Sequence, residues 1–169
     1  LVVEAFNRTG LPLVVIGDGP ERSRLEALAG PNVQLLGRLP QAEVNGWLAR
    51  CRAYVYAGLE DFGIAPVEAM AAGAPVIGLG QGGLLDTVRC LTSGVTSPTG
   101  LLFKEQSAAC LVQALESFEE GRLWRQLPAE QQRRWAEQFS PESFQQRMAA
   151  VIGHTWEQHQ RHRSERSQP

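Results

Sequence analysis

The sequence predicts an α/β domain of the doubly wound kind, a parallel sheet with helices on both faces. Short apolar and β-branched runs recur along the chain, and most are followed by a segment with apolar residues at helical spacing. The runs are nearly continuous in apolar character, which is typical of strands buried on both faces. With 43% apolar residues in a chain of 169, there is enough apolar material for one core of this kind.

The order of the expected elements follows from these runs. Five strands are expected, at 11–17, 32–37, 53–58, 74–80 and 100–103. Helices are expected at 1–10, 21–30, 40–51, from about 64 to 73, 84–90 and 107–121. Because the first ten residues already have helical spacing and do not begin with methionine, we expect the chain to be part of a longer protein.

Only helices are expected after Gly121. Ser140 followed by Pro141 is a helix-start pattern, with serine as N-cap and proline in the first turn, so the last helix should begin at 141. We expect one domain over 1–153 and a polar, disordered tail over 154–169.

Composition excludes several function classes. Lys and Arg total 16 against 18 acidic residues, so the net charge of −2 gives no attraction to nucleic acid. No apolar run approaches the roughly 20 residues that span a bilayer, and no export signal is recognisable, so we expect a cytoplasmic protein. The three cysteines have no metal-ligand spacing, and we expect reduced thiols, no bound metal and no cofactor.

The segment GLEDFGIAPVEAMAAG, residues 58–73, carries the strongest functional signal. It should lie at the carboxyl end of the strand at 53–58, where open α/β sheets bind ligands. The backbone amides at the helix start could hold a diphosphate, since a helix N-terminus has free N–H groups and partial positive charge. Those amides belong to Phe62, Gly63 and Ile64. Glu60 precedes them, and Glu68 lies about 6 Å further along the helix, within reach of a ribose.

A plainer interpretation makes Glu60 an exposed loop acid and Glu68 a solvated helix residue. Against it, we expect Ile64, Val67 and Ala71 to form the inward stripe of this helix. Glu68 would then adjoin a buried surface, where a polar side chain usually has a partner.

The same segment resembles the signature of retaining glycosyltransferases of family 4, a glycogen-synthase-like group with two facing Rossmann-like domains, the GT-B fold. The matching residues are Glu60, Phe62, Gly63, Glu68, Ala69, Met70, Ala71, Gly73, Pro75 and Val76. Further similarity lies at 14–20, 33–40, 80–88, 100–103 and 139–144, so the resemblance covers the chain to about residue 153.

The resemblance implies a role for each site residue. Glu60 would contact the donor-sugar hydroxyls as the catalytic-site carboxylate, Glu68 would bind the nucleotide ribose, and the amides named above would bind the phosphates. No bound metal is implied. From its position at the same sheet edge, the GQGG turn with Gly82 and Gly83 could lie near the donor sugar, or it could be a purely structural turn.

Bacterial mannosyltransferases of surface-polysaccharide synthesis are most similar to this variant of the motif, which favours GDP-mannose as donor. Two departures concern the donor site: Asp86 stands where the family more often has Glu, and Ala57-Gly58 replaces the common Pro-Ser. The family's phosphate-binding Arg and Lys, and its acceptor-binding domain, would lie upstream of Leu1.

The chain is therefore expected to be a donor-binding domain that is inactive alone. A glycan or lipid-linked acceptor, and any peripheral membrane contact, would reach the enzyme through the upstream domain.

Two other functions stay open. A nucleotide-sugar 2-epimerase of the same architecture would need acid and base residues facing C2 of the sugar, and the cleft region offers no histidine. A non-enzymatic nucleotide-sugar binding module would share the fold, but the presence of both Glu60 and Glu68 argues against it.

Overall fold

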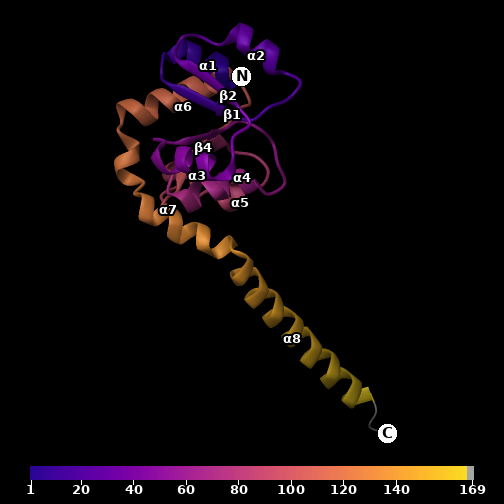
Figure 1. Cartoon of the computed structure of the whole chain (residues 1–169). Helices are drawn as coiled ribbons and strands as arrows, with labels where there is room; N and C mark the ends of the chain where they lie inside the picture. The colour runs from indigo at the N-terminus through magenta and orange to yellow at the C-terminus, as the bar shows by residue number, and fades with distance from the viewer. Residues whose placement is uncertain (167–169) are drawn as a thin grey trace. The chain divides into compact units, whose positions relative to one another are not determined.

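The computed structural model describes the backbone of residues 1–166 and the side chains of residues 1–160. It divides into two compact units, Leu1–Trp135 and the residues from Ala136 onward (Figure 1). All five predicted strands are present, and helices alternate with them as predicted. The first part contains α1 (Val2–Thr9), β1 (Leu13–Ile16), α2 (Arg22–Leu28), β2 (Val33–Gly37), α3 (Gln41–Arg50), β3 (Tyr54–Tyr56), α4 (Ile64–Ala72), β4 (Val76–Leu79), α5 (Leu84–Thr87), η1 (Leu91–Ser93), β5 (Gly100–Phe103), α6 (Ala108–Glu120), η2 (Leu123–Gln126) and α7 (Ala129–Ala136).

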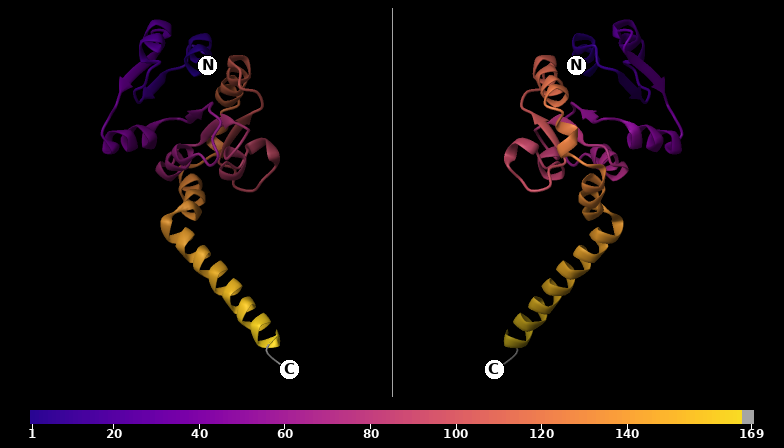
Figure 2. Two further views of the ribbon diagram at one scale, coloured as in Figure 1. Left: turned by 90° about the vertical axis from the view of Figure 1, so that its right-hand side faces the viewer. Right: turned by 90° about the vertical axis from the view of Figure 1, so that its left-hand side faces the viewer.

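The strands are parallel, as predicted, but they form two sheets instead of one (Figure 2). β1 pairs with β2, and β3, β4 and β5 pair in that order. Within residues 1–166, β1 and β3 therefore each pair on one side only. No strand within the described residues bridges the two ladders.

The main core lies on one face of the three-stranded sheet. Alternate residues of β4 and β5 point to this face, since successive side chains of a strand point to opposite sides. They pack with buried residues of α1, α6 and the segment after η2, and α1 packs directly on α6. The cluster consists of Ala5, Phe6, Ile77, Leu79, Leu101, Phe103, Leu111, Ala114, Leu115, Phe118 and Leu127.

Helix α4 covers the opposite face and contacts β3 and β4. Its buried residues are Pro66, Ala69 and Met70, whereas Ile64 is 66% exposed and Ala71 is exposed. The predicted inward stripe of Ile64, Val67 and Ala71 is therefore wrong. Every residue of this helix except Glu68 is apolar or small, so periodicity did not distinguish the face that packs on the sheet.

The second unit contains η3 (Glu137–Phe139) and α8 (Pro141–Arg166). The predicted start of the last helix is confirmed, and the Ser143 amide donates to Ser140 Oγ at 3.1 Å, as an N-cap requires. The segment expected to be a disordered tail is helical from residue 154 to Arg166, and 167–169 lie outside the described residues. No helix within residues 1–166 is long and apolar enough to cross a membrane.

Gly100 tests the packing of β5 on β4. A Cβ at this position would lie 2.1 Å from the Val76 carbonyl oxygen, so Gly100→Ala should lower the free energy of unfolding by at least about 2 kcal/mol in chemical denaturation. Gly19→Ala is the control, because a Cβ there meets nothing within 4 Å, and it should change stability by less than about 0.5 kcal/mol. Equal stability of the two variants would contradict the packing described.

Candidate functional site

The predicted site segment lies where the sequence placed it, between the carboxyl end of β3 and the start of α4. Gly63 precedes the helix with φ 86°, a left-handed conformation that side chains rarely adopt. No hydrogen bond between described residues uses the amide of Gly63 or Ile64 as donor. The side chains of Phe62 and Ile64 are exposed, 45% and 66% respectively. At the start of α4, the amides of buried Gly63 and exposed Ile64 therefore have no acceptor among the described residues.

The GQGG turn packs directly on this segment. The Gly83 amide donates to the Glu60 carbonyl oxygen at 2.7 Å. A Cβ on Gly82 would lie 2.4 Å from that same oxygen, and one on Gly83 would lie 2.5 Å from the Phe62 nitrogen. The two glycines predicted to lie near the donor sugar therefore contact the backbone of Glu60 and Phe62, and any side chain would displace it.

Glu60 is exposed and accepts a hydrogen bond from the Tyr56 hydroxyl, a contact that the sequence analysis missed. Residues Tyr54 and Tyr56 lie two apart on β3, so both rings point to one face, where they stack with centroids 6.4 Å apart. The spacing of two residues between Tyr54 and Tyr56 at the end of a strand was the sequence feature that could have indicated this pair. Burial raises the pKa of Tyr54 to about 12, and the charges of Glu60 and Glu68 add to the effect.

Glu68 projects from the exposed side of α4 and has no hydrogen-bond partner among the described side chains. The argument that Glu68 adjoins a buried stripe does not hold, because the buried face of the helix is formed by Pro66, Ala69 and Met70. The exposure of Glu68 agrees with the plainer interpretation of a solvated helix residue. Its carboxylate nevertheless acts electrostatically on Tyr54, as does that of Glu60. The two glutamates lie on either side of the start of α4 along the chain, and both side chains are exposed.

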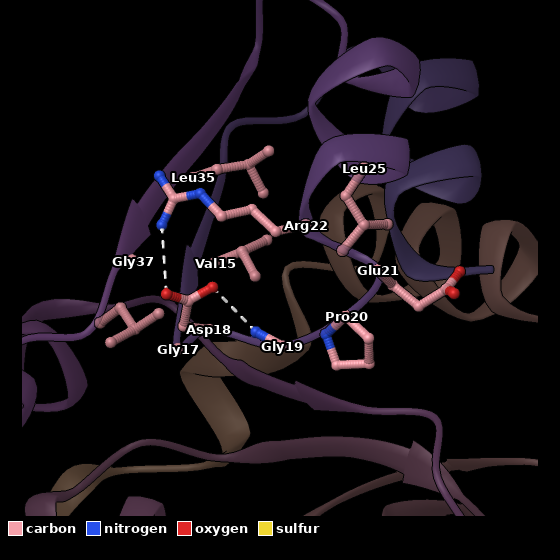
Figure 3. Close-up of a pocket in the computed structure, with 11 residues that line it drawn as sticks. Val15, Gly17, Asp18, Gly19, Pro20, Glu21, Arg22, Leu25, Leu35 and Gly37 are labelled. Atoms are coloured by element: carbon pink, nitrogen blue, oxygen red, sulfur yellow. Dashed lines mark hydrogen bonds and ion pairs between the residues drawn. The ribbon is translucent and has the colours of Figure 1, made fainter.

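A separate hollow of about 310 Å³ lies at the carboxyl ends of β1 and β2. It contains the GDGP turn, which the sequence marks between strand and helix. Figure 3 shows the Asp18 carboxylate between the Gly19 amide, which donates to it at 2.9 Å, and Arg22 Nη1, 3.9 Å away. The remaining walls are mainly apolar. The lining residues are Val15, Ile16, Gly17, Asp18, Gly19, Pro20, Glu21, Arg22, Leu25, Leu35 and Gly37.

The cysteines and acids do not form a metal site in the described part of the chain. Cys51, Cys90 and Cys110 are free and half-buried, as the sequence predicted. Among the described residues, no group of three His, Cys, Asp or Glu side chains is placed to hold an ion.

Comparison with known families gives one extended match. The family model described as "Glycosyl transferases group 1" matches residues 1–139. Among curated proteins, the phosphatidyl-myo-inositol mannosyltransferase of Propionibacterium freudenreichii is 41% identical over 80 residues, which are 46% of this chain and 19% of that protein. The 2-deoxystreptamine glucosyltransferase of Streptomyces kanamyceticus is 36% identical over 93 residues, 52% of this chain and 24% of that protein.

Solved structures show the same fold at lower identity. The sucrose-phosphate synthase of Thermosynechococcus elongatus has a TM-score of 0.68 at 22% identity, and the similarity covers 90% of this chain and 48% of that one. The Anabaena protein HepE in complex with UDP and glucose has a TM-score of 0.69 at 20% identity, covering 89% of this chain and 43% of that one. The chain thus spans less than half the length of these neighbours, and its Rossmann-like α/β fold is shared with them.

The contact between the GQGG turn and the Glu60 loop can be tested in solution. Gly83→Ala should displace the backbone of residues 60–63, because its Cβ would lie 2.4 Å from Phe62 Cα. We expect hydrogen exchange of amides in this loop to accelerate by about ten-fold or more. Leu85→Ala, at a neighbouring residue that is 61% exposed, should leave exchange unchanged. Unaltered exchange in Gly83→Ala would contradict the tight packing.

Proposed function

The chain belongs to the group 1 glycosyl transferases, and we propose that it is the donor-binding part of a retaining, family 4 enzyme that transfers a hexose from a nucleotide sugar. The observation that carries the proposal is the pair of exposed carboxylates, Glu60 and Glu68, on either side of a helix start with unpaired amides. A helix N-terminus favours an anion, and carboxylates favour hydroxyls, so together they suit a sugar joined to a diphosphate.

In this proposal the donor diphosphate lies at the start of α4. The amides of Phe62, Gly63 and Ile64 donate to phosphate oxygens, and the helix dipole stabilises their negative charge. Glu68 accepts from the ribose hydroxyls, and Glu60 accepts from hydroxyls of the transferred sugar. Gly82 and Gly83 act by holding the backbone of the Glu60 loop.

Retention of configuration requires no protein base at the anomeric carbon. The bond from C1 to the phosphate oxygen breaks while the acceptor hydroxyl attacks the same face, and its proton passes to the departing phosphate oxygen. Stabilising that developing negative charge is the main task of the enzyme. The α4 amides contribute to it within this chain, and neither a metal ion nor another cofactor is part of the proposal.

The rest of the enzyme is also part of the proposal. In the common order of a doubly wound sheet the first strand lies in the centre. The unpaired edges of β1 and β3 would accept such a strand, supplied by the protein upstream of α1. We place the phosphate-binding Arg and Lys on that strand and its turn, and the glycan or lipid-linked acceptor on a further upstream domain, with the whole enzyme in the cytoplasm.

GDP-mannose is the donor we propose. Similarity to a mannosyltransferase at 41% identity supports the sugar. The hollow at the GDGP turn offers mainly apolar walls and two acids, Asp18 and Glu21. A guanine base presents an N–H and an amino group on one edge, and a carboxylate can accept a hydrogen bond from each. Uracil presents a single N–H donor. The neighbour bound to UDP and glucose makes UDP-glucose the competing donor to be tested.

Glu68 should contribute to donor affinity. In calorimetric titration of the intact protein, Glu68→Ala should weaken binding of the preferred donor by about ten-fold, since it removes hydrogen bonds to a charged acceptor. GDP-mannose, UDP-glucose, GDP and UDP are compared side by side. The control is Glu43→Ala, which replaces an exposed glutamate on α3 and should bind the donor with wild-type affinity. Wild-type affinity in Glu68→Ala would remove the ribose assignment.

Glu60 should matter for turnover. Glu60→Gln keeps the shape of the side chain but loses its charge, and we expect kcat for sugar transfer to fall by about a hundred-fold. The anomeric configuration of the product, read by NMR, reports retention. An epimerase would instead convert the free nucleotide sugar without an acceptor, and a binding module would bind the donor with no turnover.

A further inference from the structure

Gly58 lies between β3 and the Glu60 loop, where the Tyr56 side chain leaves no room for a side chain at residue 58. A Cβ there would lie 2.8 Å from the Tyr56 hydroxyl oxygen and 2.9 Å from Tyr56 Cζ. Gly58 is not among the glycines with positive φ, so its backbone would accept any residue. The phenol ring of Tyr56 therefore occupies the place that a side chain at residue 58 would take.

The same phenol donates its hydrogen bond to Glu60 Oε1. Burial, then the hydrogen bond to Glu60, raises the pKa of Tyr56, so the hydroxyl keeps its proton at neutral pH and can only be the donor to an ionised carboxylate. The ring of Tyr54, two residues earlier on the same face of β3, stacks on the ring of Tyr56. Gln106 Nε2 donates to the Ala57 carbonyl oxygen at 2.9 Å and holds the loop backbone.

We propose that Tyr56 is a positioning residue that holds the Glu60 carboxylate. Gly58 lacks a side chain, which leaves room for the Tyr56 hydroxyl to reach Glu60. The hydrogen bond occupies Oε1 of Glu60 and leaves Oε2 free to accept from the hydroxyls of the nucleotide sugar. An exposed glutamate samples several rotamers, and holding it in one of them before the donor arrives lowers the entropy lost in the reacting complex. This inference rests on the proposed function, because it explains the Tyr56–Glu60 hydrogen bond by a role of Glu60 in sugar transfer.

The competing explanation is structural: Tyr56 could serve only to pack on Tyr54 and close the end of β3. Tyr56→Phe separates the two, because it keeps the ring and removes only the hydroxyl. A packing role would leave kcat unchanged. A positioning role would lower kcat while binding of the nucleotide without its sugar stays the same, since Glu60 is assigned to the sugar alone.

The experiment compares wild type, Tyr56→Phe and the matched control Tyr54→Phe in the intact protein. Tyr54 loses a hydroxyl from the stacked neighbouring ring, and no hydrogen bond from it to a described residue is present. For Tyr56→Phe we expect kcat to fall by about ten-fold or more, with the Kd for GDP and the Tm unchanged. Tyr54→Phe should keep kcat within about two-fold of wild type.

Gly58→Ser reaches the same hydrogen bond by another route. Its Cβ would displace the phenol, so the single variant should also lose kcat by about ten-fold. In the double variant Tyr56→Phe with Gly58→Ser the bond is already absent, and kcat should fall no further than in either single variant. Additive losses would overturn the proposal, because the two residues would then act separately.

The outcomes also separate this inference from the proposed function. A wild-type protein that transfers sugar, with Tyr56→Phe equally active, overturns the positioning role and leaves the function intact. A wild-type protein that neither binds nor transfers GDP-mannose or UDP-glucose overturns the proposed function, and the positioning role with it.

Discussion

The candidate site depends on one close approach of two backbones. The Gly83 amide donates to the Glu60 carbonyl oxygen, and neither Gly82 nor Gly83 has room for a side chain against the segment Glu60–Phe62. This contact joins the loop after β4 to the loop after β3, two connections at the same edge of the sheet. Without it, the residues ahead of α4 would be an exposed loop with few packing contacts.

The strand ahead of that loop adds a second constraint. Alternation along β3 puts Tyr54 and Tyr56 on one face, and the Tyr56 hydroxyl ends at Glu60. The pair Ala57-Gly58, which departs from the family's common Pro-Ser, fits this arrangement, because a side chain at residue 58 would collide with the phenol. A departure in the sequence thus has a local steric reason, and the glutamate itself is unchanged.

Both sheets have strands that pair on one side only, although the faces of the three-stranded sheet are covered. Both faces of β3–β5 are covered, by α6 with α1 on one side and by α4 on the other. The edges of β1 and β3 are a different matter: each has unpaired backbone groups on one side within the described residues. Unpaired strand edges are favourable places for another strand to add, so the division into two sheets is compatible with a doubly wound fold.

The sequence by itself determined the parallel α/β class, the positions of all five strands, the start of the last helix at Pro141 and the segment that holds both glutamates. Those features depend on local periodicity, turn residues and a dense motif, which are properties of neighbouring residues. Only the tertiary structure decided which face of α4 is buried, that Glu68 is exposed, and that Tyr56 and the GQGG turn converge on Glu60. In α4 almost every residue is apolar or small, so the choice of face came from packing on the sheet. The GQGG turn and Glu60 are more than 20 positions apart, so their contact leaves no local pattern to detect, whereas the bond from Tyr56 to Glu60 depends on how the chain turns after β3.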